Sequence, residues 1–152
     1  MAVKPIYTWD PETYEAGCVL YYKDRVFTGY AIAHPDDQDF AGELVGCSIA
    51  EMRANIALLR YRRDSEILPG LKALKQLYYS MKHSTSFNAK AYESKMLFNQ
   101  IKIYEEDLEL TRKMIEDLRE NLKIYIDKKD KRYKQLREYR KNSNASNLDE
   151  NV

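Results

Sequence analysis

The stretch LFNQIKIYEEDLELTRKMIEDLRENLKIY, residues 97–125, decides the fold of this chain. Its apolar side chains recur alternately four and three residues apart, which is the spacing of one buried face of a long helix or coiled coil. No proline or glycine occurs from residue 89 to residue 141. We therefore expect one long coiled-coil helix over 89–141, and its seam positions are Leu97, Ile101, Tyr104, Leu108, Thr111, Ile115, Leu118, Leu122 and Tyr125.

The same spacing continues through Lys129, Arg132, Leu136 and Tyr139, where the seam becomes polar. A helix of about fifty residues spans about 75 Å, which we expect to be more than one chain of 152 residues can cover. The sequence therefore predicts a homo-oligomer, and a dimer is expected because closed two-fold assemblies are the commonest. A second, partial apolar stripe widens the face that the shorter helices or a partner's helices would share: Met96, Ile103, Leu110, Met114 and Ile126.

The segment before this helix combines a short β region with two medium helices. Residues 17–33 are rich in β-branched and aromatic side chains, which predicts a β-hairpin that turns at Lys23-Asp24-Arg25. The spacing of Val45, Ile49, Met52, Ile56 and Leu59 predicts a helix over 40–63. Leu68-Pro69-Gly70 is expected to break that helix, and a second helix follows from about 70 to 82.

These elements define the expected architecture and its boundaries. The fold class is mainly α with a small N-terminal β-hairpin (α+β), two medium helices and one long C-terminal coiled-coil helix. We expect a hairpin-plus-helices domain over 1–88 and the long helix over 89–141. Residues 142–152, NSNASNLDENV, are polar and of low complexity, and we expect them to form a disordered tail.

Composition excludes several classes of protein. The net charge of +1 gives no bulk attraction to polyanions, and no apolar run approaches the ~20 residues of a membrane span. The opening MAVKPIYTWD lacks the apolar core of a signal peptide. We expect a cytoplasmic protein that does not contact membranes and whose two cysteines, Cys18 and Cys47, are reduced and buried. No phosphate-binding loop, dinucleotide fingerprint or nucleophile elbow is present, so we expect no enzyme and no cofactor.

One short motif follows the predicted hairpin: Ala33-His34-Pro35-Asp36-Asp37. It resembles the metal motif of the LmbE/PIG-L family of zinc-dependent deacetylases. The resemblance implies zinc bound by His34 and Asp37, Asp36 as the base, and a doubly wound parallel sheet. The family also needs a later His-x-x-His, whereas the other histidine here, His83, lies in Lys-His-Ser-Thr. The structural interpretation, which we favour, is a strand-to-helix turn in which Pro35 ends the strand and Asp37 or Asp39 caps the next helix.

A broader resemblance covers Tyr22 to Arg60, about a quarter of the chain. It is carried by Gly29-x-Ala31-x-x-His34-Pro35-x-Asp37, followed by a helix that contains Arg53-Ala54. This pattern resembles a group of small proteins of unknown function that are encoded by phages and prophages of Gram-positive bacteria. The resemblance implies a non-enzymatic phage-type accessory protein in the host cytoplasm. We expect such a protein to inhibit host defence by stoichiometric binding of a defence protein or a nucleotide signal. For a nucleotide, the candidate ligands are Tyr22 and Tyr30 as stacking faces and Arg53 as a phosphate clamp.

The alternative function is a nucleic-acid-binding module. Residues 128–141, KKDKRYKQLREYRK, carry eight basic and two acidic side chains, whereas residues 105–120 carry seven acidic and three basic ones. Basic side chains interleaved with tyrosines can contact phosphates and stack on bases. The candidate contacts are Lys128, Lys131, Arg132, Lys134, Arg137 and Arg140. The opposite charges of the two segments also permit staggered antiparallel pairing between subunits, which we place before nucleic-acid binding.

Overall fold

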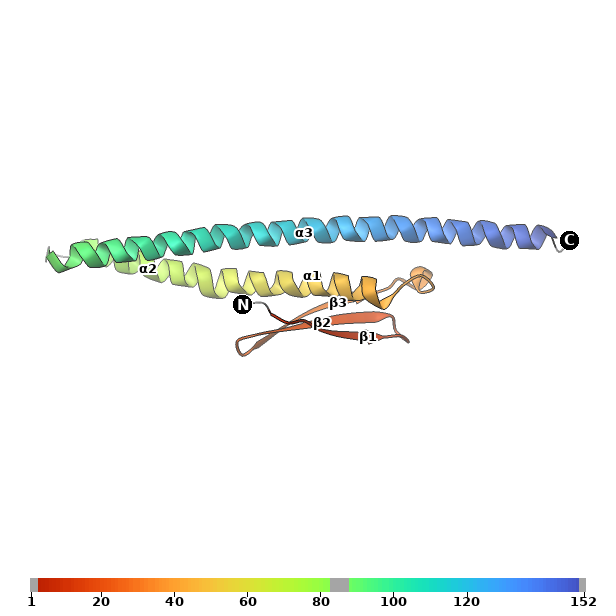
Figure 1. Ribbon diagram of the computed structural model, residues 1–152, viewed down its shortest axis with the longest axis horizontal. Helices are drawn as coiled ribbons and strands as arrows, with labels where there is room; N and C mark the ends of the chain where they lie inside the picture. Colours follow the sequence, from red (N-terminus) through yellow and green to blue (C-terminus); the bar gives the residue numbers. More distant parts are fainter. Residues whose placement is uncertain (1–2, 83–87, 151–152) are drawn as a thin grey trace. The chain divides into compact units, whose positions relative to one another are not determined.

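The computed structural model describes residues 3–82 and 88–150. It is mainly helical, with one small N-terminal sheet (Figure 1). This arrangement confirms the predicted fold class and extends the hairpin by a third strand. In chain order the elements are β1 (Ile6–Asp10), β2 (Glu15–Tyr22), β3 (Arg25–Ile32), the 3-10 turn η1 (Pro35–Asp37), α1 (Glu43–Tyr61), the π-helical turn η2 (Arg62–Ile67), α2 (Leu68–Lys82) and α3 (Asn88–Glu150).

The three strands form an antiparallel sheet in the order β1-β2-β3. The Asp10 carboxylate accepts hydrogen bonds from the backbone N–H groups of Glu12 and Thr13 at 2.9 and 3.4 Å, which closes the turn between β1 and β2. The second turn holds Lys23 at a φ of 54°, a left-handed conformation that non-glycine residues adopt uncommonly. Strand alternation then directs Ala16, Cys18 and Leu20 to one buried face.

The chain divides into two compact units. One unit comprises Met1–Ala57 and Leu118–Val152, and the other comprises Leu58–Asp117. This division does not follow the predicted boundary at residue 88. The reason is that each half of α3 buries its apolar face against a different set of neighbours.

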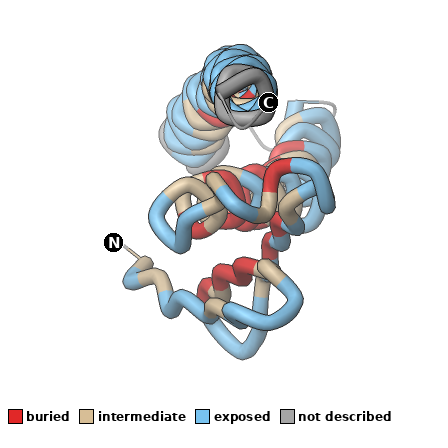
Figure 2. Tube along the Cα trace, turned by 90° about the vertical axis from the view of Figure 1, so that its right-hand side faces the viewer, coloured by how far each residue is buried: buried red, intermediate tan, exposed pale blue. Residues whose placement is uncertain are grey.

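In the first unit, α1 lies between the sheet and the C-terminal half of α3 (Figures 1 and 2). The core of this unit combines Ala16 and Ala31 from the sheet with Cys47 and Ile49 from α1. Side chains of α3 pack against the same cluster, namely Leu122, Tyr125 and Ile126. The apolar stripe predicted for the helix over 40–63 therefore faces a core, as its spacing requires.

A glycine sets how closely α1 approaches the sheet. A Cβ atom built on Gly29 of β3 would lie 2.6 Å from the backbone nitrogen of Ala54 and closer still to the carbonyl oxygen of Ala50. Both atoms belong to the backbone of α1, so neither moves aside without moving the helix. Gly29 therefore allows a backbone-to-backbone contact that any larger residue would open.

In the second unit, η2 and α2 pack on the N-terminal half of α3. The core cluster consists of Ile67, Leu71, Ile101 and Leu108, with Tyr104 packed against it. A Cβ atom on Gly70 would lie 2.6 Å from the Tyr104 ring, so the glycine makes room for that ring. Lys75 and Glu105 pair across the two helices at 3.2 Å.

The predicted helix break at Leu68-Pro69-Gly70 is wrong. The chain stays helical from Glu43 to Lys82, and the π-helical turn η2 ends two residues before the proline. The Leu68 N–H bonds to the Arg63 carbonyl, five residues back, instead of the usual four. This wider turn accommodates a proline, which lacks an N–H and crowds the preceding turn of an ordinary α-helix.

The predicted seam of α3 is confirmed, but the expectation that one chain is too small to cover it is wrong. All nine seam positions from Leu97 to Tyr125 are buried or half-buried within the single chain. Beyond Tyr125 the predicted seam positions no longer match the buried face of the helix: Tyr133 is buried, whereas Arg132 and Tyr139 are exposed. A straight helix has 3.6 residues per turn, so a pattern of 3.5 rotates off the buried face with distance.

The predicted disordered tail is also wrong for its described part. Residues 142–150 continue α3 as helix to Glu150. The last glycine of the sequence is Gly70 and the last proline is Pro69, so no strong helix breaker follows, and serine and asparagine are only mildly unfavourable in helices. Across the described residues, no helix is long and apolar enough to cross a membrane.

Gly29→Ala is expected to destabilise the protein by roughly 2–3 kcal/mol, because the new methyl group overpacks against backbone atoms of α1. Urea unfolding followed by circular dichroism measures the change. Gly42→Ala is the matched control, since a Cβ there meets nothing within 4 Å, and we expect a change within about 1 kcal/mol of either sign. Equal stability of the Gly29→Ala variant and the wild type would refute the close packing.

Candidate functional site: a basic groove beside the His-Pro-Asp-Asp turn

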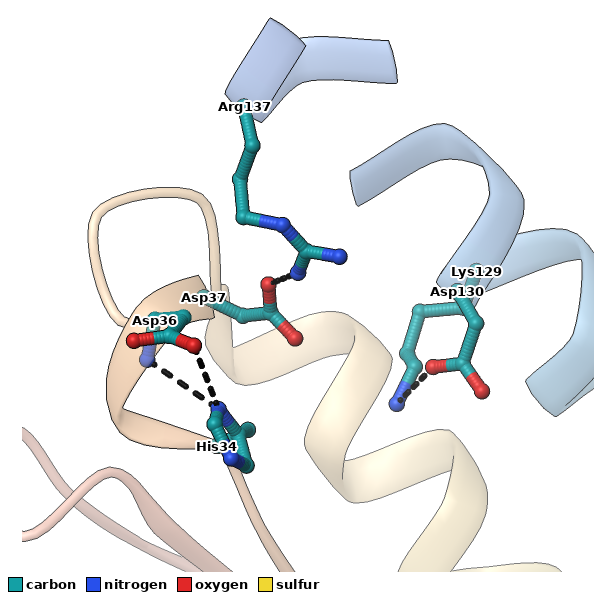
Figure 3. Close-up of polar contacts among 6 residues, drawn as sticks. All are labelled: His34, Asp36, Asp37, Lys129, Asp130 and Arg137. Atoms are coloured by element: carbon teal, nitrogen blue, oxygen red, sulfur yellow. Dashed lines mark hydrogen bonds and ion pairs between the residues drawn. The ribbon is translucent and has the colours of Figure 1, made fainter. Parts of the chain in front are cut away.

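His34 acts as a cap of the 3-10 turn η1. Its Nδ1 accepts a hydrogen bond from the Asp36 N–H at 3.2 Å and lies 3.5 Å from an Asp36 carboxylate oxygen (Figure 3). Both side chains are exposed. This local arrangement confirms the interpretation of the motif as a turn, although a histidine ring, and not an aspartate, makes the capping contact.

Asp37 points away from His34 and toward α3, where it pairs with Arg137 (Figure 3). The Asp37 side chain is only 11% exposed, and that guanidinium supplies its counter-charge. Asp39 pairs in the same way with Arg140, but both partners are largely exposed. The predicted helix cap at Asp37 or Asp39 is therefore wrong, because α1 begins only at Glu43 and both carboxylates bind arginines of α3.

The zinc site implied by the deacetylase resemblance is not formed. His34 and Asp37 turn to different partners, and the part of the chain that the structure describes contains no group of three His, Cys, Asp or Glu side chains able to hold a metal ion. The sheet is antiparallel with three strands, not doubly wound and parallel. His83, the other histidine, lies outside the described residues.

The basic segment of α3 splits into two sets. Arg137 and Arg140 are engaged with Asp37 and Asp39. The other four predicted nucleic-acid contacts are exposed, namely Lys128, Lys131, Arg132 and Lys134. Between them, Lys129 pairs with Asp130 at 3.0 Å, and its ammonium lies 5.7 Å from the centre of the Tyr133 ring.

Part of this segment lines an open groove of about 450 Å³, which we call the basic groove. Its lining residues are Phe40, Gly42, Leu44, Val45, Tyr125, Lys128, Lys129, Arg132, Tyr133 and Leu136. Three of these are cationic and none is acidic. Leu44, which is 80% exposed, and Leu136 add apolar surface. The volume lies within the ~300–1,000 Å³ typical of ligand sites.

Aromatic packing between Phe40 and Tyr133 of α3 forms one wall of the groove. The Phe40 and Tyr133 rings lie 6.2 Å apart between centroids with a 39° tilt. Tyr133 is buried, and this burial, reinforced by the charge of Asp37, raises the pKa of its phenol. The groove therefore has a fixed aromatic wall that stays neutral at physiological pH.

Only part of the groove could be predicted from the sequence. The basic residues of α3 are visible as a cluster, and Tyr133 is visible as an aromatic among them. Phe40 and Leu44 are missed because they precede the apolar stripe of α1. The available signal is that Leu44 is a large apolar residue outside that stripe, next to Gly42.

Of the residues predicted to bind a nucleotide, the structure brings Arg53 to Tyr30 but does not bring the two tyrosine rings together. Tyr22 pairs with Arg25 and Tyr30 pairs with Gly17 in the strand register, which places the two rings on opposite faces of the sheet. Arg53 donates from Nη1 to the Tyr30 backbone carbonyl at 2.6 Å. The guanidinium thus contacts the protein backbone.

A second cavity lies beside the His-Pro-Asp-Asp turn, but it is small. It measures about 40 Å³ and is lined by residues that include Trp9, Tyr14, His34, Asp37 and Tyr133. This volume suits ordered water, not a nucleotide. We therefore take the basic groove as the candidate site.

The two cysteines are free and buried. Burial raises the pKa of both thiols, and Cys47 donates weakly to the Thr8 carbonyl at 3.9 Å. A buried thiol with a raised pKa has little thiolate at neutral pH and reacts slowly. This placement gives Cys18 and Cys47 a packing role within the first unit.

No protein-family model matches this chain, and neither a curated protein nor a solved structure is significantly similar to it. The resemblance to the phage-encoded group stays a prediction. The functional argument therefore depends on the geometry of the groove.

Arg137→Ala is expected to lower the free energy of unfolding by about 1–3 kcal/mol, because it leaves the Asp37 carboxylate buried without a counter-charge. Arg140→Ala is the matched control three residues away. It removes an exposed pair and is expected to cost less than about 1 kcal/mol. Urea unfolding at low salt measures both changes. Equal losses in the two variants would contradict the burial argument.

Native protein at pH 8 is expected to resist a thiol reagent such as a maleimide, because neither Cys18 nor Cys47 offers an exposed thiolate. In urea both cysteines should react rapidly, and mass spectrometry counts the adducts. Rapid labelling of either cysteine without denaturant would show that the first unit opens readily.

Proposed function

We propose that this chain is a non-enzymatic binding protein whose basic groove holds an acidic, amphipathic segment of another protein. The observation that supports this proposal is the lining of the groove, which combines three cationic side chains and no carboxylate with an exposed leucine. A helix with an apolar face and acidic edges satisfies both features at once. The apolar contacts would supply affinity, and the cations would supply orientation and speed of association.

Two features favour a protein partner over a nucleic acid. First, the ion pairs with Asp37 and Asp39 remove Arg137 and Arg140 from the predicted phosphate-binding set. Second, Tyr133, the aromatic residue central to the basic segment, is buried and packed against Phe40. Base stacking needs an exposed ring face, which Tyr133 does not offer.

The class of target follows from the phage resemblance. A phage-encoded binding protein that acts stoichiometrically in the host cytoplasm would block a host-defence protein by occupying an acidic surface on it. A nucleotide signal is the less favoured target, because Tyr22, Tyr30 and Arg53 do not converge.

The test uses two fluorescent probes: a short helical peptide of leucine and glutamate, and a short single-stranded DNA. We expect the peptide to bind at low salt. Lys128→Glu/Arg132→Glu should weaken that binding at least about tenfold, or ~1.4 kcal/mol, because both residues line the groove. Lys131→Glu/Lys134→Glu is the matched control. It changes the charge equally on the same helix outside the groove, and it should have little effect. Fluorescence anisotropy at low and high salt measures both.

Two outcomes reject the proposal. If DNA binds more tightly than the peptide, and both double variants weaken it alike, the segment acts as a nucleic-acid-binding surface with delocalised charge. If neither probe binds at low salt, the groove is not a binding site for acidic partners.

A further inference from the structure

A second apolar stripe on α3 remains exposed after the seam is buried. Within the second unit, Met96, Ile103, Leu110 and Met114 are each 43–57% exposed. Their spacings of seven, seven and four residues place them on one face of the helix. The neighbouring face, which carries Ile101 and Leu108, is already packed in the core of that unit. The exposed stripe is therefore an additional surface beyond the one that the fold uses.

Acidic side chains border this stripe. Glu106 and Asp107 each lie three or four residues from both Ile103 and Leu110, and Asp117 lies three residues beyond Met114. Lys113, three residues beyond Leu110, adds one positive charge, so the border is acidic on balance. Residues at these spacings are neighbours on a helix surface. The stripe is thus an apolar helix face with acidic edges, which is the chemistry that the basic groove is proposed to accept.

We infer that a second copy of this chain supplies the occupant, with the Met96–Met114 stripe of one copy docked on the basic groove of the other. This inference rests on the proposed function and names the partner that fills the groove when no other target is present. The charges are complementary, since the exposed Lys128 and Arg132 of the groove would face Glu106 and Asp117 of the stripe. Lys129 and Asp107 already pair within the chain, with Asp130 and Arg62. Leu44 and Leu136 would meet Ile103 and Leu110.

Each copy carries one stripe and one groove, and closed two-fold pairs are the commonest form of self-association. A stable pair of this kind would have to bury about 1,200–2,000 Å² in total. Pairing of this kind also closes the groove. A target would have to displace the second copy, so the fraction of grooves that are free would fall as the protein concentration rises.

The test measures the dissociation constant of the pair by sedimentation or light scattering over a dilution series, using full-length protein. The wild type is expected to dimerise reversibly and to dissociate more readily at high salt. Leu110→Glu should weaken the pair at least about tenfold. Leu77→Glu is the matched control, because Leu77 is a leucine of the same unit that is similarly exposed, and it should change the constant less than about twofold.

A charge exchange tests the pairing itself. Lys128→Glu/Arg132→Glu and Glu106→Lys/Asp117→Lys should each weaken self-association. A mixture of the two variants should form a mixed pair that regains both contacts, one with the wild-type charges and one with the charges exchanged. Circular dichroism and urea unfolding of each variant distinguish lost contacts from lost folding. The inference is overturned if the wild type is monomeric at the highest concentration, if Leu110→Glu has no effect, or if Leu77→Glu weakens the pair as much.

The outcomes also separate this inference from the proposed function. A monomeric wild type that still binds the acidic peptide through the groove keeps the proposed function and rejects self-pairing. A dimer that the groove variant disrupts, in a protein that binds no acidic peptide, keeps self-pairing and rejects the wider binding function.

Discussion

Burial of the α3 seam is the constraint on which the rest of the structure depends. A helix of 63 residues that carries an apolar face cannot leave that face in water, so each half needs a cover. The first half is covered by η2 and α2, and the second half by α1 with the sheet behind it. The unbroken run from Glu43 to Lys82 is what allows one chain to supply both covers.

The main helices could be predicted from the periodicity of the apolar residues, whereas the connections between these helices could not. The seam from Leu97 to Tyr125 follows directly from a spacing that admits one regular structure. The failure at Pro69 has a physical cause, because a π-helical turn can precede a proline when tertiary packing favours continuity. The fit of Gly70 against Tyr104 is an example of such packing. Rules based on the local sequence do not predict this contact.

Charge explains why the candidate site was only partly visible in the sequence. A basic cluster over 128–141 is compatible with phosphate binding, with a solvated surface and with internal ion pairs. The fold divides these roles among the residues, since Arg137 and Arg140 reach carboxylates about one hundred positions earlier, while Lys128 and Arg132 line the groove. Contacts over such a separation depend on how the C-terminal half of α3 packs within the first unit, which periodicity does not encode.

Under the proposed pairing, the same distribution of charge would link self-association to target binding. The acidic and basic segments of α3 lie on one helix that cannot fold back on itself, so the proposed contact joins two molecules. An acidic target would then compete with an identical chain for one surface. Competition favours a target whose apolar face is larger than the Met96–Met114 stripe, because the three cations of the groove attract both alike and only the apolar contact differs. Specificity would therefore reside in Leu44, Val45 and Leu136 more than in the charges, even though the charges are what the sequence makes visible.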